Sequence, residues 1–173
     1  MNLVDDFSFG EFGKSLNTFI EIPKGSRNKI EYDLKKQVFV LDRVEPSIFS
    51  KPVNYGFVPQ TIDEDGDPLD TLVVTNEPLP MGILVTAKVI GVLNFVDDGE
   101  NDHKIICVPS DDRDSGDSIN SLEDLSIGFK KQLEHHFNHY KDLKKPGSVS
   151  VEGWGDAEAA WRIIKECNER YTK

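Results

Sequence analysis

Short apolar runs separated by turn-forming residues fill the first two-thirds of the chain. Six of them have the length and the β-branched and aromatic content of strands, and they cover residues 18–22, 29–33, 38–43, 71–75, 83–96 and 104–109. The run 83–96 is long for a single strand, and Gly91 within it predicts a bulge or bend. This part of the chain is therefore predicted to form a β-sheet.

The last third changes to helical spacing. A first helix is predicted to start at the capping sequence 121–124 and to end before Pro146 and Gly147, with apolar positions at Leu122, Leu125, Phe129, Leu133, Phe137 and Tyr140. A second helix is predicted from Asp156, with an inner face of Ala157, Ala160, Trp161, Ile164 and Tyr171. Strands followed by terminal helices predict an α+β fold that is mainly β, with a small closed barrel as the expected form of the sheet.

The composition predicts one acidic domain, residues 1–173. With 31 acidic and 20 basic residues the formal net charge is −11, which argues against nucleic acid or an anionic membrane as a partner, because both require a basic surface. No stretch has the pattern of a secretory signal or a membrane span. The two cysteines, Cys107 and Cys167, lack metal-ligand spacing, and a reducing, cytoplasmic location is expected.

The segment 63–70, Asp-Glu-Asp-Gly-Asp-Pro-Leu-Asp, contains five carboxylates. Carboxylates this close repel one another unless a cation lies among them. Mg²⁺ prefers oxygen ligands and also binds the phosphate oxygens of substrates. The segment is not an EF-hand loop, because Pro68 and Val74 stand where a loop starting at Asp63 needs Gly and Glu. A solvated acidic turn is the alternative interpretation.

A second acidic cluster, residues 97–102, follows the longest predicted strand, and Lys104 begins the next one. Alone, this cluster is typical of a solvated hairpin turn. If both clusters lie at one rim of the sheet, they predict a site for several metal ions. The side chains that a phosphate site needs, cationic and phenolic donors, also occur near the ends of predicted elements: Lys29, Arg43, Tyr55, Lys104, Tyr140 and Lys141.

Two further patterns leave alternatives open. His135 and His139 are four residues apart, a spacing that can bind Zn²⁺, but no third ligand is evident; a subunit contact and solvent exposure are the alternatives. The acidic, polar segment 111–117 is predicted to be a solvated loop, and a contribution to closure over a substrate is its alternative.

The spaced motifs of the chain resemble family I soluble inorganic pyrophosphatases of the bacterial type. Asp65-Gly66-Asp67-Pro68-Leu69-Asp70 matches the D-x-D-P-x-D signature of that family. The resemblance extends over residues 16–161 through Glu21-Ile22-Pro23, Lys29, Glu31, Asp42-Arg43 and the segments 52–57, 91–93, 97–104, 139–143 and 151–154. It implies a five-stranded OB-type closed barrel with two C-terminal helices, a homohexamer, and hydrolysis of pyrophosphate to two orthophosphates with several Mg²⁺ ions per active site.

The resemblance also implies a role for each site residue. Asp65, Asp70 and Asp102 would hold the first metal ion, with Asp70 bridging to the second. Asp97 and Asp102 would bind ions that arrive with the substrate, and Glu31 would hold another through water. Asp67 would lie beside the attacking water as its general base. The two phosphates would be bound by Lys29, Arg43, Tyr55, Lys104, Tyr140 and Lys141.

The chain departs from the family pattern at a few positions. Lys51 stands where the family often has Tyr near the phosphate pocket, which puts the role of that position in doubt, and Ile30 and Asp98 replace other residues beside matched ones. Three other functions remain open: a barrel that binds single strands or partner proteins, a non-catalytic scaffold for divalent ions, and another two-metal phosphohydrolase. Phosphate release separates the first two from a pyrophosphatase, and substrate competition separates the third.

Overall fold

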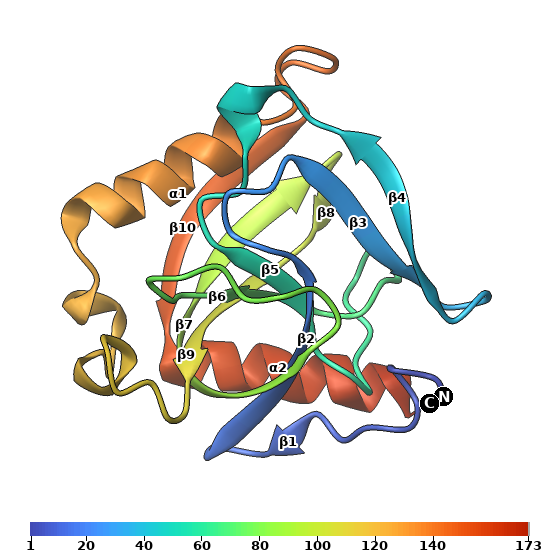
Figure 1. The fold of residues 1–173 in the computed structure, drawn as a ribbon, viewed down its shortest axis with the longest axis vertical. Helices are drawn as coiled ribbons and strands as arrows, with labels where there is room; N and C mark the ends of the chain where they lie inside the picture. Colours follow the sequence, from blue (N-terminus) through green and yellow to red (C-terminus); the bar gives the residue numbers. More distant parts are fainter. Residues whose placement is uncertain (173) are drawn as a thin grey trace.

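The computed structural model describes residues 1–172 of the chain. Its strands are β1 (Gly10–Glu11), β2 (Ser15–Ile22), β3 (Asn28–Asp33), β4 (Val38–Val44), β5 (Asn54–Phe57), β6 (Asp70–Val73), β7 (Leu84–Asp97), β8 (Glu100–Asn101), β9 (Lys104–Pro109) and β10 (Val149–Asp156). The α-helices are α1 (Ile127–His139) and α2 (Ala157–Tyr171) (Figure 1). The prediction of a mainly-β α+β fold with two C-terminal helices is confirmed.

Five strands each pair with two others of the same set. β2 pairs with β5 and β7, β6 pairs with β5 and β9, and β9 also pairs with β7, so the pairings follow a cycle β2–β5–β6–β9–β7 that returns to β2. The β6–β9 pair is parallel and the other pairs are antiparallel. β10 extends the sheet beside β7, and β3 and β4 form a separate hairpin.

The long strand β7 crosses the sheet with the irregularity that Gly91 predicts. Its register against β9 shifts between Val89 and Gly91. A Cβ atom at Gly91 would lie 2.5 Å from Leu122 Cδ1 and 2.7 Å from the carbonyl oxygen of Gly155. The absence of a side chain therefore allows β10 and the 122–124 turn to pack against the middle of β7.

Besides the two-residue strands β1 and β8, the periodicity did not predict β5 and β10. β5 is only four residues long and is buried throughout, so it shows no alternation. Its Gly56 lies against β2, where a Cβ atom would be 2.1 Å from the Phe19 carbonyl oxygen. β10 is irregular, since its register against β7 shifts between Val151 and Gly153. Tertiary pairing, rather than local sequence preference, makes these two segments strands.

The first predicted helix is wrong at its N-terminal end. The Ser121–Asp124 capping box closes only a 3₁₀ turn, Leu122–Asp124, after which Leu125 and Ser126 are extended. Helix α1 begins at Ile127, where the Ser126 hydroxyl accepts a hydrogen bond of 3.1 Å from the Phe129 backbone N–H. The second helix starts as predicted, with the Asp156 carboxylate accepting from the Ala159 N–H at 2.9 Å.

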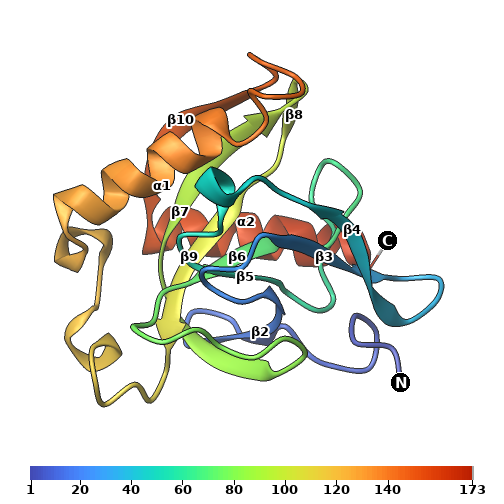
Figure 2. The ribbon, with the colours of Figure 1, turned by 45° about the horizontal axis from the view of Figure 1, so that its top comes forward.

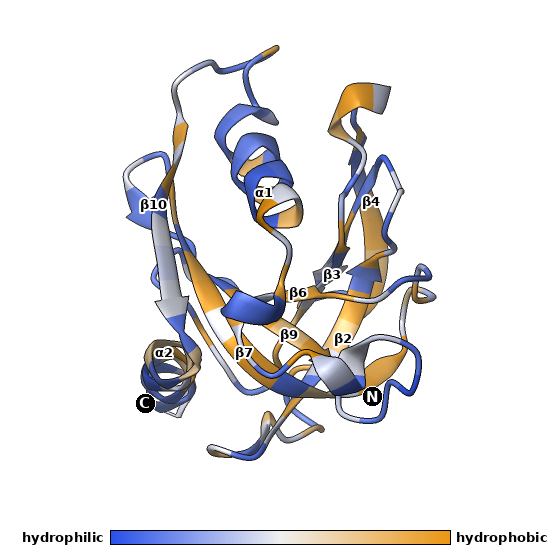
Figure 3. Ribbon diagram, turned by 90° about the vertical axis from the view of Figure 1, so that its left-hand side faces the viewer, coloured by the Kyte–Doolittle hydropathy of each residue, from blue (hydrophilic) through white to orange (hydrophobic). Residues whose placement is uncertain are grey.

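The two helices and the β3–β4 hairpin pack against different strands of the sheet: α2 against β7, α1 against β10, and β3 against β2. Helix α2 packs on β7 through Ala160, Ile164 and Cys167, which join one buried cluster with sheet residues. In Figure 3, helix α1 and the β3–β4 hairpin both stand above the curved strands β7, β9 and β2, with α1 on the β10 side; Figure 2 shows the same arrangement from another angle. Within residues 1–172, neither helix has the length and apolar character needed to cross a membrane.

Candidate functional site

A pocket of about 320 Å³ opens between the β3–β4 hairpin, the 63–70 loop and the C-terminal end of α1. Its volume equals that of roughly ten water molecules in the liquid, which fits a small hydrated anion. All of the predicted site residues except Lys104 line it: Lys29, Glu31, Arg43, Tyr55, Asp65, Asp67, Asp70, Asp97, Asp102, Tyr140 and Lys141. Lys104 is buried beneath them.

Strand register brings the acidic segments together. In the parallel β6–β9 pair, Asp70 stands opposite Lys104, so the end of the first acidic segment meets the strand that follows the second. The second segment is a hairpin between β7 and β8, with positive φ angles at Asp98 (52°) and Gly99 (87°). This turn leaves Asp98 exposed and places Asp97 and Asp102 on the pocket wall.

Lys104 is the centre of the buried part of the site. Its Nζ lies 2.5 Å from an oxygen of Asp70 and 2.5 Å from an oxygen of Asp102, and the Tyr55 hydroxyl donates to the same Asp70 oxygen. Burial alone would lower the pKa of Lys104, but the two carboxylates raise it above its ordinary value. Burial and the charge of Asp70 raise the pKa of Asp102 to about 7, against the effect of Lys104.

A second cationic contact closes the opposite side of the pocket. The Lys141 ammonium donates to Asp97 Oδ2, and the Tyr140 hydroxyl lies 3.4 Å from the same oxygen. The other oxygen, Asp97 Oδ1, is buried without a hydrogen-bond partner among the described residues. A carboxylate oxygen in this state favours a cationic ligand, because an unpaired buried acceptor loses its hydration without compensation.

The β3–β4 hairpin supplies the basic wall. Lys29 and Arg43 are cross-strand neighbours. Lys29 Nζ pairs with Glu31 at 2.7 Å, while Arg43 contacts Asp42 and Glu45 at 2.5 Å each. Since both cations already have carboxylate partners on their own hairpin, their side chains are held in place at the pocket before an anion arrives.

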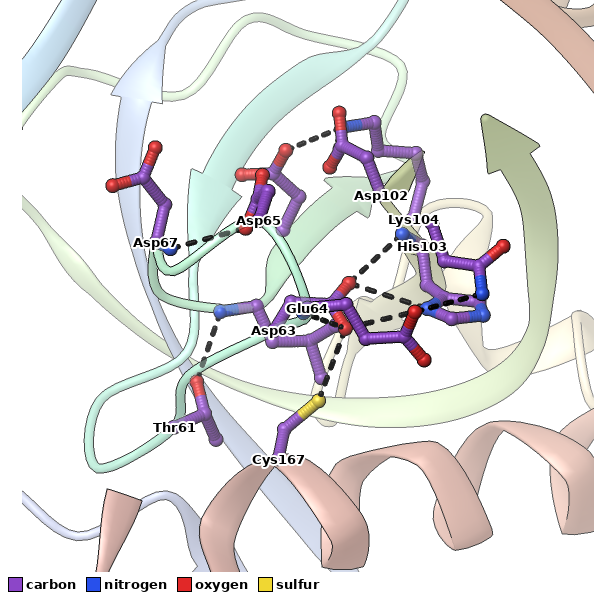
Figure 4. A network of polar contacts seen from close by, with 12 residues as sticks. Thr61, Asp63, Glu64, Asp65, Asp67, Asp102, His103, Lys104 and Cys167 are labelled. Atoms are coloured by element: carbon purple, nitrogen blue, oxygen red, sulfur yellow. Dashed lines mark hydrogen bonds and ion pairs between the residues drawn. The ribbon is translucent and has the colours of Figure 1, made fainter. Parts of the chain in front are cut away.

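The exposed tip of the 63–70 loop carries Asp65 and Asp67. Withdrawal of its carboxylate from water, together with the charges of Asp70 and Asp67, raises the pKa of Asp65 to about 6. Partial burial and the charges of Asp70 and Glu31 also raise the pKa of Asp67. The Asp67 backbone N–H donates to Asp65 Oδ1 at 3.0 Å, which fixes the turn while both carboxylates remain in the pocket (Figure 4).

Glu21 is a pocket residue that the sequence analysis quoted in a motif but did not place in the site. It is buried in β2 and lines the pocket. Its carboxylate accepts from the Tyr32 backbone N–H at 2.7 Å, while burial and the charge of Asp70 raise its pKa to about 8. The available signal was a single carboxylate between the apolar residues Ile20 and Ile22 of a strand, because such a residue needs a specific reason to be buried.

Lys51, whose role the family pattern left in doubt, lies behind two of the predicted phosphate ligands. Its Nζ is 5.2 Å from the ring centroids of both Tyr55 and Tyr140. The side chain is buried, and burial together with the charges of Lys29 and Lys104 lowers its pKa to about 7. Lys51 is therefore a buried base near both rings, and it does not line the pocket.

The histidine pair does not belong to this pocket. His135 and His139 are exposed on α1 with ring centroids 4.5 Å apart, and His139 Nδ1 lies 2.7 Å from Asp142. Within residues 1–172, no three side chains of His, Cys, Asp or Glu are gathered closely enough to hold a metal ion as they stand. The subunit contact remains a prediction.

The donor set of the pocket nevertheless fits hard divalent cations. Lys104 and Lys141 already neutralise part of the carboxylate charge by pairing with Asp70, Asp102 and Asp97. Among the described residues, Asp65 and Asp67 have no ion pair and Asp97 Oδ1 has no hydrogen-bond partner, so carboxylate oxygens of the pocket remain without a cation. Oxygen donors in excess of cations are the environment that Mg²⁺ selects.

Comparison with known proteins agrees with the contents of this pocket. Residues 18–172 match the model of the inorganic pyrophosphatase family. Inorganic pyrophosphatases of Neisseria meningitidis serogroup B and Haemophilus influenzae are each 58% identical to this chain, over 93% and 91% of it and over 91% and 90% of their own lengths.

Solved structures of the same family have the same fold. A crystal structure of an inorganic pyrophosphatase from Neisseria gonorrhoeae superposes with a TM-score of 0.97 at 54% identity, covering 99% of this chain and 100% of the other. The structure from Thermus thermophilus gives a TM-score of 0.92 at 38% identity and covers both chains completely, at 100% each. The sequence match, the fold and the side chains of the pocket agree, and the chain belongs to the inorganic pyrophosphatase family, whose members hydrolyse pyrophosphate.

Proposed function

We propose that this chain hydrolyses pyrophosphate to two orthophosphates with Mg²⁺, using a water molecule as the nucleophile. The observation that carries the proposal is the composition of this pocket, where carboxylates for cations and Lys, Arg and Tyr donors for phosphate line the same small volume. A scaffold that only binds divalent ions does not require the second set.

The carboxylates Asp65, Asp70, Asp97 and Asp102 would hold the metal ions, with Glu31 acting through water. Bound divalent ions supply a water of lowered pKa and neutralise the oxygens of the phosphorus under attack. Asp67 is the proposed general base. It lies at the pocket without a side-chain ion pair among the described residues, and a pKa raised by burial and by the neighbouring carboxylates brings it closer to that of an effective base.

The cationic and phenolic side chains have the complementary task. Lys29, Arg43 and Lys141 reach the pocket from two sides, and each can transfer a hydrogen bond from its present carboxylate partner to a phosphate oxygen. Tyr140 would donate beside Lys141, and Tyr55 and Lys104 would donate from the buried side of the pocket. These groups stabilise the charge that develops on the departing phosphate, which is the main requirement when the leaving group is an anion.

Further features of the family are proposed for this chain as well. The cycle of pairings through β2, β5, β6, β9 and β7 supports a five-stranded closed barrel of the OB type. The exposed His135 and His139 on α1 are available for contacts in a homohexamer. The two buried, unpaired cysteines are consistent with a reducing cytoplasm.

The experiment that tests the proposal is release of phosphate from pyrophosphate, with Mg²⁺ and with EDTA. Rapid release is expected only with Mg²⁺, and Asp70→Ala is expected to raise the Mg²⁺ concentration for half-maximal rate by about tenfold or more, because it removes the proposed bridging ligand. Equal release in EDTA would refute the metal requirement. Unchanged Mg²⁺ dependence in Asp70→Ala would remove Asp70 from the ligand set.

A further inference from the structure

Asp63 differs from the other carboxylates of the first acidic segment. It is 2% exposed, whereas Glu64, Asp65 and Asp67 are exposed. It does not line the pocket, so neither the metal ions nor the substrate of the proposed function account for it. A buried carboxylate must be compensated by several hydrogen bonds, and its partners therefore indicate its role.

The partner outside its own segment on this side is His103, which directly follows the second acidic cluster, 97–102. Asp63 Oδ2 accepts from the His103 backbone N–H at 2.9 Å and lies 3.2 Å from His103 Nδ1 (Figure 4). Asp63 Oδ1 accepts from the Glu64 backbone N–H at 2.9 Å, and the Asp63 N–H donates to the Asp67 carbonyl oxygen at 2.7 Å. The backbone of Asp63 thus closes its own loop, and its side chain ties that loop to the residue between Asp102 and Lys104.

Helix α2 also contacts Asp63 and its neighbour Ile62. Cys167 Sγ lies 3.5 Å from Asp63 Oδ1, and the Cys167 carbonyl oxygen accepts from the Ile62 N–H at 3.0 Å. The Arg170 guanidinium donates to the Ile62 carbonyl oxygen at 2.5 Å. Against the effect of burial, the bonds from His103 keep the pKa of Asp63 below its ordinary value, so the carboxylate is ionised and accepts on both oxygens.

We propose that Asp63, through His103, is a positioning residue that sets the separation between Asp65 and Asp70 on one segment and Asp102 on the other, and thereby the affinity of the pocket for divalent cations. The inference rests on the proposed function, since it takes these three carboxylates as metal ligands. Groups that orient metal ligands without touching the metal commonly change metal affinity by ~10–100-fold when removed.

Asp63→Asn is the informative variant. An amide has nearly the shape of the carboxylate but only one accepting oxygen, so it cannot accept from both the Glu64 and the His103 backbone N–H groups. We expect the dissociation constant for Mg²⁺, measured by calorimetry without substrate, to rise about tenfold. At saturating Mg²⁺ the kcat should stay within about threefold of the parent value, because the tie affects ligand spacing and not Asp67.

His103→Gln and Asp117→Asn complete the experiment. His103→Gln removes the ring contact and keeps the backbone tie, so a smaller rise of about threefold is expected, and it serves as the deciding variant if Asp63→Asn does not fold. Asp117→Asn removes an exposed carboxylate outside the pocket and should leave Mg²⁺ affinity unchanged. Parent-like Mg²⁺ affinity in folded Asp63→Asn, or in His103→Gln when that is the deciding variant, overturns the inference. Failure of the parent protein to bind Mg²⁺ overturns the proposed function and the inference with it.

Discussion

Two acidic segments of this chain, 63–70 and 111–117, are similar in composition but differ in environment. In the first, Asp65, Asp67 and Asp70 face a pocket shared with other carboxylates, and the pKa values of Asp65 and Asp67 are raised. In the second, no residue lines the pocket. There Asp112 Oδ1 accepts from the Asp114 and Ser115 backbone N–H groups at 3.1 and 3.3 Å.

The difference lies in how each segment compensates its charge. Against the effect of its burial, the backbone N–H groups of Ser115 and Asp114 lower the pKa of Asp112, and Asp111 pairs with Arg113 at 2.9 Å in solvent. The 111–117 segment is therefore internally satisfied, in agreement with the predicted solvated loop. In the 63–70 segment, hydrogen bonds compensate the charge of Asp63, whereas the carboxylates of Asp65 and Asp67 at the tip have no ion-pair partner among the described residues. Two segments with a similar density of carboxylates can therefore differ in whether they offer free oxygens to a metal ion.

The largest expected effect separates the two segments by activity. Asp67→Asn should lower kcat for pyrophosphate by roughly 10²–10⁴-fold at neutral pH, because an amide cannot take the proton of the attacking water. Asp117→Asn makes the same chemical change in the other segment and should leave kcat within about twofold. The measurement is steady-state phosphate release at saturating Mg²⁺. Full activity in Asp67→Asn would remove Asp67 from the role of base.

A second prediction concerns the free energy of unfolding and how much the buried Lys51 behind the pocket lowers it. Lys51→Met should stabilise the metal-free protein by roughly 2–4 kcal/mol at pH 7, because the native pKa of Lys51, about 7, lies below the ordinary 10.5. Between pH 7 and pH 10.5 the unfolded chain binds a proton at Lys51 that the folded chain does not. The loss of unfolding free energy caused by Lys51 is therefore largest below pH 7 and disappears as the pH rises to 10.5.

Urea unfolding of both proteins in EDTA at pH 7 and pH 9.5 measures this difference. The gain in unfolding free energy from Lys51→Met should shrink by a large fraction at the higher pH. A gain that is independent of pH would indicate a packing effect rather than a buried ammonium.

The smallest expected effect has the opposite sign and lies in the 111–117 segment. Asp112→Ala removes the acceptor for two backbone N–H groups and should destabilise the protein by about 0.5–1 kcal/mol, with no change in Mg²⁺ affinity. Thermal unfolding with and without Mg²⁺ checks both statements. If the Mg²⁺-induced shift in Tm is smaller in this variant than in the parent protein, the 111–117 segment also contributes to the site.

Much of the site could be predicted from the sequence, because its residues follow short, locally ordered motifs. The D-x-D-P-x-D signature and the clusters at 97–104 and 139–143 place carboxylates and cations beside predicted element ends. The structure gathers all of the predicted site residues except Lys104 around one pocket and puts Lys104 beneath them. Glu21 was missed because its pattern, one carboxylate in an apolar strand, does not indicate which space it faces.

The sequence by itself determined the residue types, the acidic balance and the positions of β7, β9 and α2. The tertiary structure decided the rest. β5 and β10 are strands because neighbours pair with them, and α1 starts at Ile127 because Leu125 and Ser126 are extended. Tertiary structure also decided the different environments of the two acidic segments, 63–70 and 111–117. Hydrogen bonding and burial depend on residues distant in the chain, such as His103 and Cys167 around Asp63, and local patterns contain no information about them.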